Sequence, residues 1–73
     1  MNTQDVNAKI ENAFTYHQPK NDQSQRYTEL RDLAKHLAIK MSELCPPSRE
    51  LSIAMTNLEQ AVMWANASIA RNE

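Results

Sequence analysis

The sequence predicts an all-α protein, and three observations support this prediction. The 73 residues include no glycine, the residue that most two-residue turns between strands require. Two long stretches carry apolar residues at helical spacing. Two adjacent prolines, which a helix interior does not accommodate, separate them. At this length there is room for a single domain, residues 1–73, with a short N-terminal helix and an antiparallel hairpin of two long helices.

The first predicted helix spans residues 3–14. Apolar side chains fall on one of its faces: Val6, Ile10, Ala13 and Phe14. A helix of this length is only marginally stable alone in water, so we expect it to dock on something. Residues 16–22, which follow, are polar and contain a proline, and they predict a loop.

The second predicted helix spans residues 22–43. Its apolar positions repeat at alternating intervals of three and four, as in a heptad seam: Tyr27, Leu30, Ala34, Leu37, Met41 and Leu44. Leu33 and Ala38 widen this seam. Pro46 and Pro47 end the helix, because consecutive prolines cannot continue it.

The third predicted helix spans residues 49–72. Ser48 is suited to cap its N-terminus, and Glu50 in the first turn favours the helix dipole. Its main seam consists of Leu51, Ala54 or Met55, Leu58, Ala61 or Val62, Ala65 and Ile69. At 1.5 Å per residue both long helices measure roughly 30 Å, and the short break between them predicts an antiparallel hairpin.

Self-association is predicted from the surplus of apolar residues and from the small size of the chain. Ile53, Met63 and Trp64 fall outside the main seam, so the first helix or another chain must cover them. We interpret Met63 and Trp64 as interface residues. Domains below about 80 residues usually need a disulfide, a metal or oligomerisation, and the single cysteine cannot form an internal disulfide.

The sequence offers no catalytic group, metal site or cofactor motif. Cys45, His17 and His36 have spacings that match no zinc pattern. Cys45 lies in the proline turn with no histidine nearby in sequence, which favours an incidental thiol over a nucleophile. The acidic residues are scattered singly along the helices, as on solvated faces. We therefore expect a protein that is not an enzyme, holds no metal and uses no cofactor.

Charge and hydropathy exclude several kinds of partner. The net charge is −1, whereas proteins that wrap a long polyanion carry a large basic excess, so polymeric nucleic acid is not expected. No run of about 18 apolar residues predicts a membrane span. The polar N-terminal stretch does not resemble a signal peptide, and we expect a cytoplasmic protein.

One local stretch is suited to bind a small phosphorylated ligand. Residues 16–40 carry five basic and three acidic side chains. Aromatic rings in this stretch can stack on bases, and its cations can bind phosphate oxygens. The candidate residues are Tyr16, His17, Lys20, Arg26, Thr28, Arg31 and Lys35. Thr28, Arg31 and Lys35 share a helix face away from the leucine seam. The alternative interpretation, an ordinary solvated face beside a loop, is the more common one for such a composition.

Three stretches form an ordered pattern along the chain. They are residues 14–20 (FTYHQPK) followed by Arg26, Tyr27 and Arg31, residues 44–50 (LCPPSRE) and residues 59–73 (EQAVMWANASIARNE). In order and spacing they resemble the small phage proteins that sequester cyclic oligonucleotide signals of bacterial CBASS defence, the family of anti-CBASS protein type two. The resemblance covers nearly all of residues 14–73, and residues 1–13 lie outside it.

The resemblance implies a helical protomer that assembles into a homohexamer and binds cyclic dinucleotides such as 3′,3′-cGAMP between protomers, without cutting them. It implies that Tyr16 stacks on a base and that Arg31 meets phosphate. Some members also bind cyclic trinucleotides at a separate site near a threefold axis, and the matching residue here is Arg71. The family often has glycine after the loop lysine, where this sequence has Asn21.

Two other functions are alternatives to the sequestration of nucleotides, which we call the sponge hypothesis. A DNA-binding regulator needs a short turn before a basic recognition helix, but here the turn is Pro-Pro and the following helix carries only Arg49 and Arg71. A protein-binding adaptor that uses the Trp64 surface is the second alternative, and the sequence leaves it open. The sponge and the adaptor hypotheses predict different assemblies. A sponge forms a homo-oligomer on its own, whereas an adaptor leaves its Trp64 surface uncovered until a partner binds.

Overall fold

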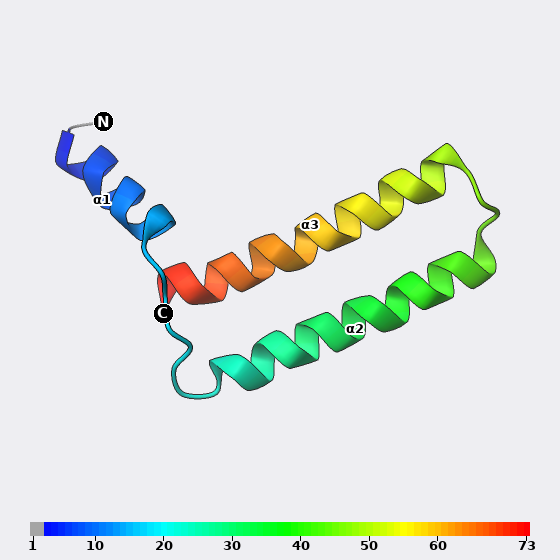
Figure 1. Ribbon diagram of the computed structural model, residues 1–73, viewed down its shortest axis with the longest axis horizontal. Coiled ribbons are helices and arrows are strands. Elements are labelled where there is room, and N and C mark those ends of the chain that lie inside the picture. Colours follow the sequence, from blue (N-terminus) through cyan, green and yellow to red (C-terminus); the bar gives the residue numbers. More distant parts are fainter. Residues whose placement is uncertain (1–2) are drawn as a thin grey trace.

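The computed structural model describes residues 3–73, and within this range the chain forms three helices and no strand (Figure 1). Helix α1 spans Thr3–Phe14, α2 spans Gln23–Leu44 and α3 spans Arg49–Asn72. The predicted all-α architecture is confirmed. The predicted bounds of α1 and α3 are reproduced, and α2 begins and ends one residue later than predicted.

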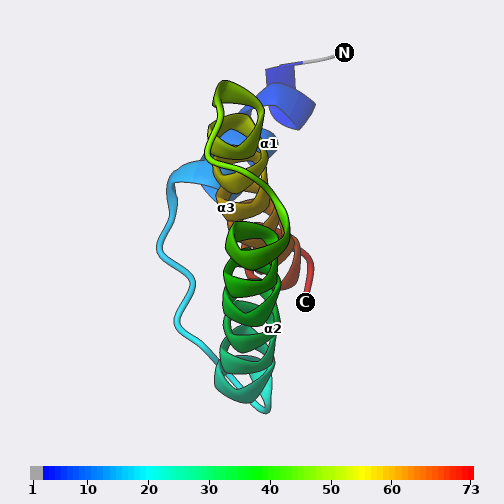
Figure 2. The ribbon, with the colours of Figure 1, turned by 90° about the vertical axis from the view of Figure 1, so that its right-hand side faces the viewer.

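Helices α2 and α3 run antiparallel as a hairpin, which gives the chain extents of 49 × 30 × 15 Å (Figures 1 and 2). Below, the turn end is the end at residues 45–48, and the open end is the opposite one, where α2 begins and α3 ends. Helix α1 projects away from the hairpin at the open end. Its apolar face is not covered within this chain, because Val6, Ile10 and Phe14 are exposed, and the expected docking stays a prediction.

Local hydrogen bonds define the turn end. The Ser48 side-chain oxygen accepts from the Leu51 amide at 3.1 Å, which confirms the predicted cap of α3. The Cys45 amide donates to the Met41 carbonyl at 2.9 Å and ends α2 before the two prolines. Each bond satisfies a backbone or capping group that the helix ends leave without an intrahelical partner.

The seam between the long helices follows the predicted positions except at Leu37 and Leu44 of α2. Tyr27, Leu30, Ala34 and Met41 of α2 are half-buried, but Leu37 is 50% exposed and Ala38 is half-buried in its place. A helix has 3.6 residues per turn, so a strict alternation of three and four drifts away from a straight partner. Leu44, at the end of the same predicted seam, is also exposed.

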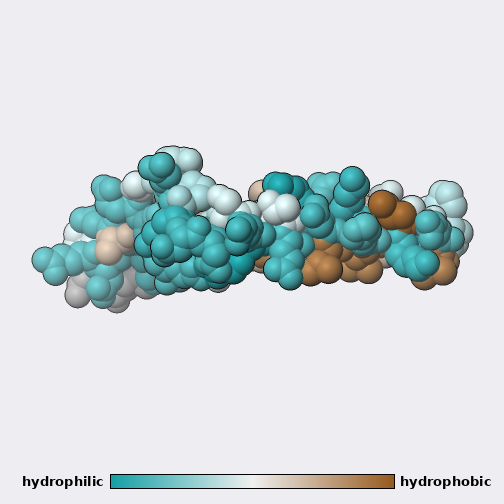
Figure 3. Space-filling view, turned by 90° about the horizontal axis from the view of Figure 1, so that it is seen from below, coloured by the Kyte–Doolittle hydropathy of each residue, from teal (hydrophilic) through white to brown (hydrophobic). Residues whose placement is uncertain are grey.

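Large apolar side chains remain at the surface of this protomer. Among residues 3–73 the only buried side chain is Gln23, and the core contains no fully buried apolar residue. Met63 and Trp64 are 67% and 66% exposed, so α1 does not cover them. In the view of Figure 3 the apolar residues gather toward the turn end, and polar residues cover the open end. In this view the polar side chains of the protomer are thus concentrated at the open end.

Candidate functional site

A hollow of about 450 Å³ lies at the open end, between the loop after α1 and the two long helices. We call it the open-end hollow. Its lining comes from α1, the loop, α2 and α3: Ala13, Thr15, Tyr16, His17, Tyr27, Arg31, Asn66, Ala67, Ala70 and Arg71. Four of the residues singled out in the sequence, Tyr16, His17, Arg31 and Arg71, meet here, although they lie on three separate segments.

Helix α3 supplies one wall of the open-end hollow through a single helix face. Asn66 and Ala70 are four residues apart, and so are Ala67 and Arg71, so the two pairs form neighbouring rows on one side of the helix. The two alanines carry short side chains, so the wall is recessed between the longer Asn66 and Arg71. Ala67 and Ala70 thus leave space for a flat group against the α3 wall.

The loop places an aromatic and an imidazole ring at the open-end hollow. Tyr16 is 82% exposed, so its ring is free to stack on an incoming planar group. His17 donates from Nε2 to the Asn12 carbonyl oxygen at 2.8 Å and thereby ties the loop to the end of α1. Its ring is half-buried, which makes it more a support of the loop than an open stacking surface.

Two guanidinium groups give the open-end hollow a positive charge. Arg31 donates from Nη2 to the Thr28 hydroxyl oxygen at 3.4 Å, and Thr28 in turn donates to the Ser24 carbonyl at 3.0 Å. Neither Arg31 nor Arg71 forms an ion pair within residues 3–73, and the lining residues include no carboxylate. Both cations are thus available for the phosphates of a ligand.

Four predicted residues lie outside the lining of the open-end hollow: Lys20, Arg26, Thr28 and Lys35. Thr28 contributes only through its bond to Arg31. Lys35 lines a different and largely apolar groove of about 460 Å³, which it shares with Arg31. Lys20 lies in the loop, where its backbone amide, rather than its ammonium group, donates a hydrogen bond to Gln23 Oε1. The structure therefore leaves both lysines out of the open-end hollow, and Lys35 shares only the apolar groove with Arg31.

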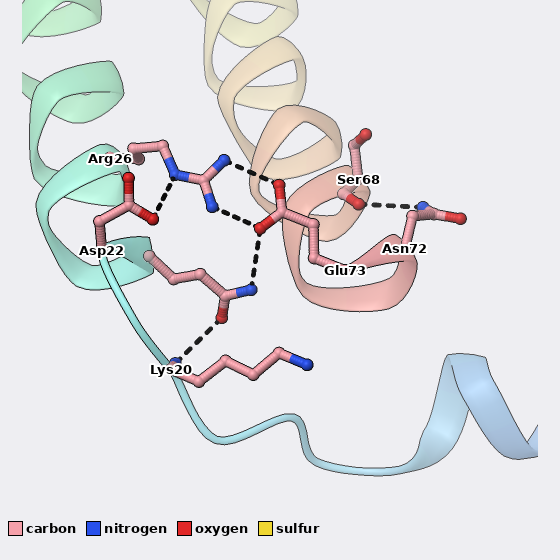
Figure 4. Close-up of polar contacts among 7 residues, drawn as sticks. Lys20, Asp22, Arg26, Ser68, Asn72 and Glu73 are labelled. Carbon is pink, nitrogen blue, oxygen red and sulfur yellow. Dashed lines mark hydrogen bonds and ion pairs between the residues drawn. The ribbon is translucent and has the colours of Figure 1, made fainter.

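A polar cluster closes the open end beside the hollow (Figure 4). Arg26 donates from Nη2 to Glu73 Oε1 and from Nη1 to Glu73 Oε2, the latter at 2.7 Å. The Nε of Arg26 lies 3.2 Å from Asp22 Oδ1. The hydrogen bonds from Arg26 and then Gln23 lower the pKa of Glu73 to about 2. The Glu73 carboxylate, followed by Asp22, raises the pKa of Arg26. The positive charge of Arg26 is thus paired with Glu73 and Asp22 and is not available to a ligand. The sequence had grouped Arg26 with the residues that bind a ligand.

Comparison with known proteins identifies the family of this chain. A family model described as the hairpin domain of Acb2/Tad1 matches residues 6–70. The chain belongs to the Acb2/Tad1 hairpin family. That family is the anti-CBASS protein 2 and anti-Thoeris sponge family, and it is associated with the sequestration of cyclic nucleotide signals. The resemblance seen in the sequence is confirmed, and the match also includes most of residues 1–13. No curated protein and no solved structure matches the chain.

In this Acb2/Tad1 hairpin, sequence reasoning missed Asn66 and Tyr27 as lining residues of the open-end hollow. Asn66 Oδ1 is buried and has no hydrogen-bond partner among residues 3–73. Such an oxygen is a polar atom for which a ligand or a second chain would supply a partner. Only the one-face spacing with Ala67, Ala70 and Arg71 could have indicated Asn66 in advance.

Residues 3–73 also carry information on metal sites and membrane spans. They contain no group of three or more histidine, cysteine, aspartate or glutamate side chains placed to hold a metal ion. No helix in the same range has the length and hydropathy to cross a membrane. The open-end hollow is the site where the aromatic and cationic groups of the Acb2/Tad1 hairpin meet.

Proposed function

We propose that this Acb2/Tad1 hairpin binds cyclic dinucleotide messengers of bacterial CBASS immunity and withholds them from their effector in the host cytoplasm during phage infection. The observation that carries the proposal is the convergence of Tyr16, Arg31 and Arg71 on one hollow without a competing carboxylate. Sequestration acts by mass action on the free messenger, so it needs affinity and abundance rather than a catalytic group.

The chemistry of the open-end hollow matches a nucleotide. Tyr16 offers an exposed ring for a base, and Arg31 offers a planar fork of donors that suits phosphate oxygens. Arg71 supplies a second cation on the α3 wall. Within one chain Arg71 lines the same hollow as Tyr16 and Arg31, so a separate trinucleotide site at Arg71 would have to be completed by other protomers.

The proposed binding unit is an oligomer, with a hexamer as the expected assembly. The absence of a fully buried apolar side chain from residues 3–73 supports self-association, because a single protomer leaves its hydrophobic surface in water. A cyclic dinucleotide has two bases and two phosphates, so a pocket shared by two chains can give each half one Tyr16 and one Arg31. The expected stoichiometry is one dinucleotide for two chains.

Calorimetric titration with 3′,3′-cGAMP, followed by extraction and chromatography of the bound ligand, tests this proposal. We expect tight binding and recovery of the intact cyclic dinucleotide. Recovery of a linear product would identify an enzyme and contradict sequestration. An absence of heat with both 3′,3′-cGAMP and cyclic trinucleotides would contradict the proposed ligand class.

Matched substitutions locate the binding groups. Tyr16→Ala removes the ring and is expected to weaken dinucleotide binding by about tenfold or more, whereas Tyr16→Phe keeps the stacking surface and much of the affinity. Arg31→Ala is expected to weaken binding by at least about tenfold through loss of a charge-assisted hydrogen bond. Arg49→Ala, at the turn end of α3, is the control and should leave binding unchanged. Full affinity in both Tyr16→Ala and Arg31→Ala would place the ligand elsewhere.

A protein-binding adaptor is the second candidate function. The exposure of Met63 and Trp64 favours it, because a large exposed apolar patch marks a surface that another protein covers. Sedimentation or light scattering of the purified chain separates the two proposals. A monomer with these side chains open to solvent supports the adaptor, and a stable homo-oligomer supports the sponge.

A further inference from the structure

The most deeply buried side chain of the described residues is polar. Gln23, the first residue of α2, is 3% exposed, whereas no apolar residue among residues 3–73 is buried. Burying an amide is unfavourable unless its donor and acceptor are both bonded. Both ends of the Gln23 amide are bonded here, each to a different segment of the chain.

One end of the amide closes the loop that carries Tyr16. The Lys20 backbone amide donates to Gln23 Oε1 at 3.1 Å, and the Gln23 backbone amide donates to the Lys20 carbonyl at 3.0 Å. These reciprocal bonds fix the last residues of the loop against the first turn of α2. The other end of the loop is fixed by His17, which bonds the end of α1.

The other end of the Gln23 amide reaches α3. Gln23 Nε2 donates to Glu73 Oε1 at 3.2 Å, and Arg26 holds the same carboxylate in a bidentate ion pair (Figure 4). Glu73 follows Arg71 by two residues, so the bond joins the loop to the helix end that supplies the second cation. Gln23 itself does not line the open-end hollow.

We infer that Gln23 is a positioning residue, which fixes the loop bearing Tyr16 at a set distance from the α3 wall bearing Arg71. The inference rests on the proposed function for its effect on the ligand, but its structural part stands on the bonds alone. Because Gln23 joins the two segments through one amide, it determines how wide the open-end hollow is when the ligand enters. Preorganised walls bind more tightly than walls that must be ordered during binding.

An exchange of the two side chains tests the inference. In Gln23→Glu two carboxylates face each other, and the bond to Glu73 is lost. In the double variant Gln23→Glu with Glu73→Gln the amide and the carboxylate trade places, so the bond between residues 23 and 73 forms in the reverse direction at the same net charge, while Arg26 keeps only its Nη1 contact with residue 73. Amide hydrogen exchange of residues 15–22 and titration with 3′,3′-cGAMP are measured for both variants and for the wild type.

We expect Gln23→Glu to accelerate exchange in the loop and to weaken dinucleotide binding about tenfold, and the double variant to restore a part of both, since Arg26 loses one of its two contacts with residue 73. Glu43→Gln is the matched control, since it removes a carboxylate from an exposed ion pair with Lys40 near the turn end. It should change neither quantity. Restoration is the result that a nonspecific loss of stability would not produce.

The outcomes separate this inference from the proposed function. Unchanged exchange and affinity in Gln23→Glu, or a double variant that is no better than the single one, would overturn the positioning role while leaving the sponge intact. A wild type that binds no cyclic nucleotide would remove the sponge, and loop exchange alone would then decide whether Gln23 holds the loop.

Discussion

The two ends of the helical hairpin are held by contacts of different range. At the turn end Ser48, Leu51 and Cys45 bond to residues three or four positions away. At the open end Asn12 donates to the Arg71 carbonyl at 3.1 Å across 59 positions, and the Gln23–Glu73 bond joins residues 50 positions apart. The turn end therefore forms from local sequence, whereas the open end exists only after the hairpin closes.

This difference coincides with the division between scaffold and site. Local contacts reach full strength as soon as a helix forms, so they stabilise without requiring tertiary structure. Long-range contacts bring together side chains that the sequence keeps apart, which a binding site made from several segments requires. Changes at the open end should therefore affect ligand binding, and changes at the turn end should affect stability alone.

The largest expected effect is at the wall of the open-end hollow. Ala70→Leu places a branched side chain in the recess between Asn66 and Arg71, where the ligand is expected to lie. Overpacking of about 2 kcal/mol corresponds to roughly thirtyfold weaker binding of 3′,3′-cGAMP. Titration calorimetry measures the change. Ala61→Leu, the same substitution on the exposed side of α3, is the control.

Retained affinity in Ala70→Leu would mean that the ligand avoids the α3 wall. A similar loss in Ala61→Leu would show that the added bulk acts through assembly rather than through the open-end hollow. Light scattering of both variants identifies that case, because the oligomer would then change size.

The next effect concerns stability at the turn end. Ser48→Ala removes the oxygen that caps α3 and is expected to lower the free energy of unfolding by about 1 kcal/mol. Thermal unfolding followed by circular dichroism, at equal protein concentrations, should show a Tm several degrees lower. Dinucleotide affinity should not change. A weakened affinity at unchanged Tm would contradict the division between the two ends.

The sequence predicted the turn end almost completely and the open end only in part. Ser48 as cap and the proline break follow from local rules, and both are found. The one-position shift from Leu37 to Ala38 arises because a heptad count ignores the drift of a straight helix. The Gln23–Glu73 bond had no local signal, since it links residues on different helices.

The candidate site shows the same limit. The sequence grouped Tyr16 with Arg31 and, through the family resemblance, assigned Arg71 to a separate site, whereas the structure places all three around one hollow. The sequence did not indicate that Arg26 forms an ion pair with Glu73, because a cation and an acid far apart in sequence give no sign of pairing. Asn66 was missed since an asparagine in a helix has no distinctive pattern.

The Glu73 carboxylate predicts a pH dependence confined to the open end. Its pKa falls from the ordinary 4.5 to about 2 in the folded chain, so ionised Glu73 stabilises the fold above about pH 4.5. This contribution is lost as the pH falls through about 2. The Tm of the wild type should exceed that of Glu73→Gln at pH 7, and the difference should shrink toward zero near pH 2.

The exposed pair at the other end gives the reference for that measurement. Glu43 lies 3.7 Å from Lys40 in a single, solvent-exposed contact, and such pairs contribute little. The Tm difference between wild type and Glu43→Gln should therefore be smaller at pH 7 than the difference for Glu73→Gln. Equal differences would show that the bidentate contact of Glu73 adds nothing beyond an ordinary surface pair.

The smallest expected effect is at Asn21, which has a left-handed backbone with φ of 54°. Asparagine adopts this conformation more readily than other residues with a side chain, and glycine adopts it without steric cost. Asn21→Gly should change dinucleotide affinity by less than about twofold. Glycine removes the steric cost of the positive φ but raises the conformational entropy of the unfolded chain, and these two effects on the loop nearly cancel. Asn21→Val should disturb the loop, since a β-branched residue disfavours positive φ. A tenfold loss on Asn21→Gly would show that the Asn21 side chain itself meets the ligand, and the loop would then act through contact as well as through shape.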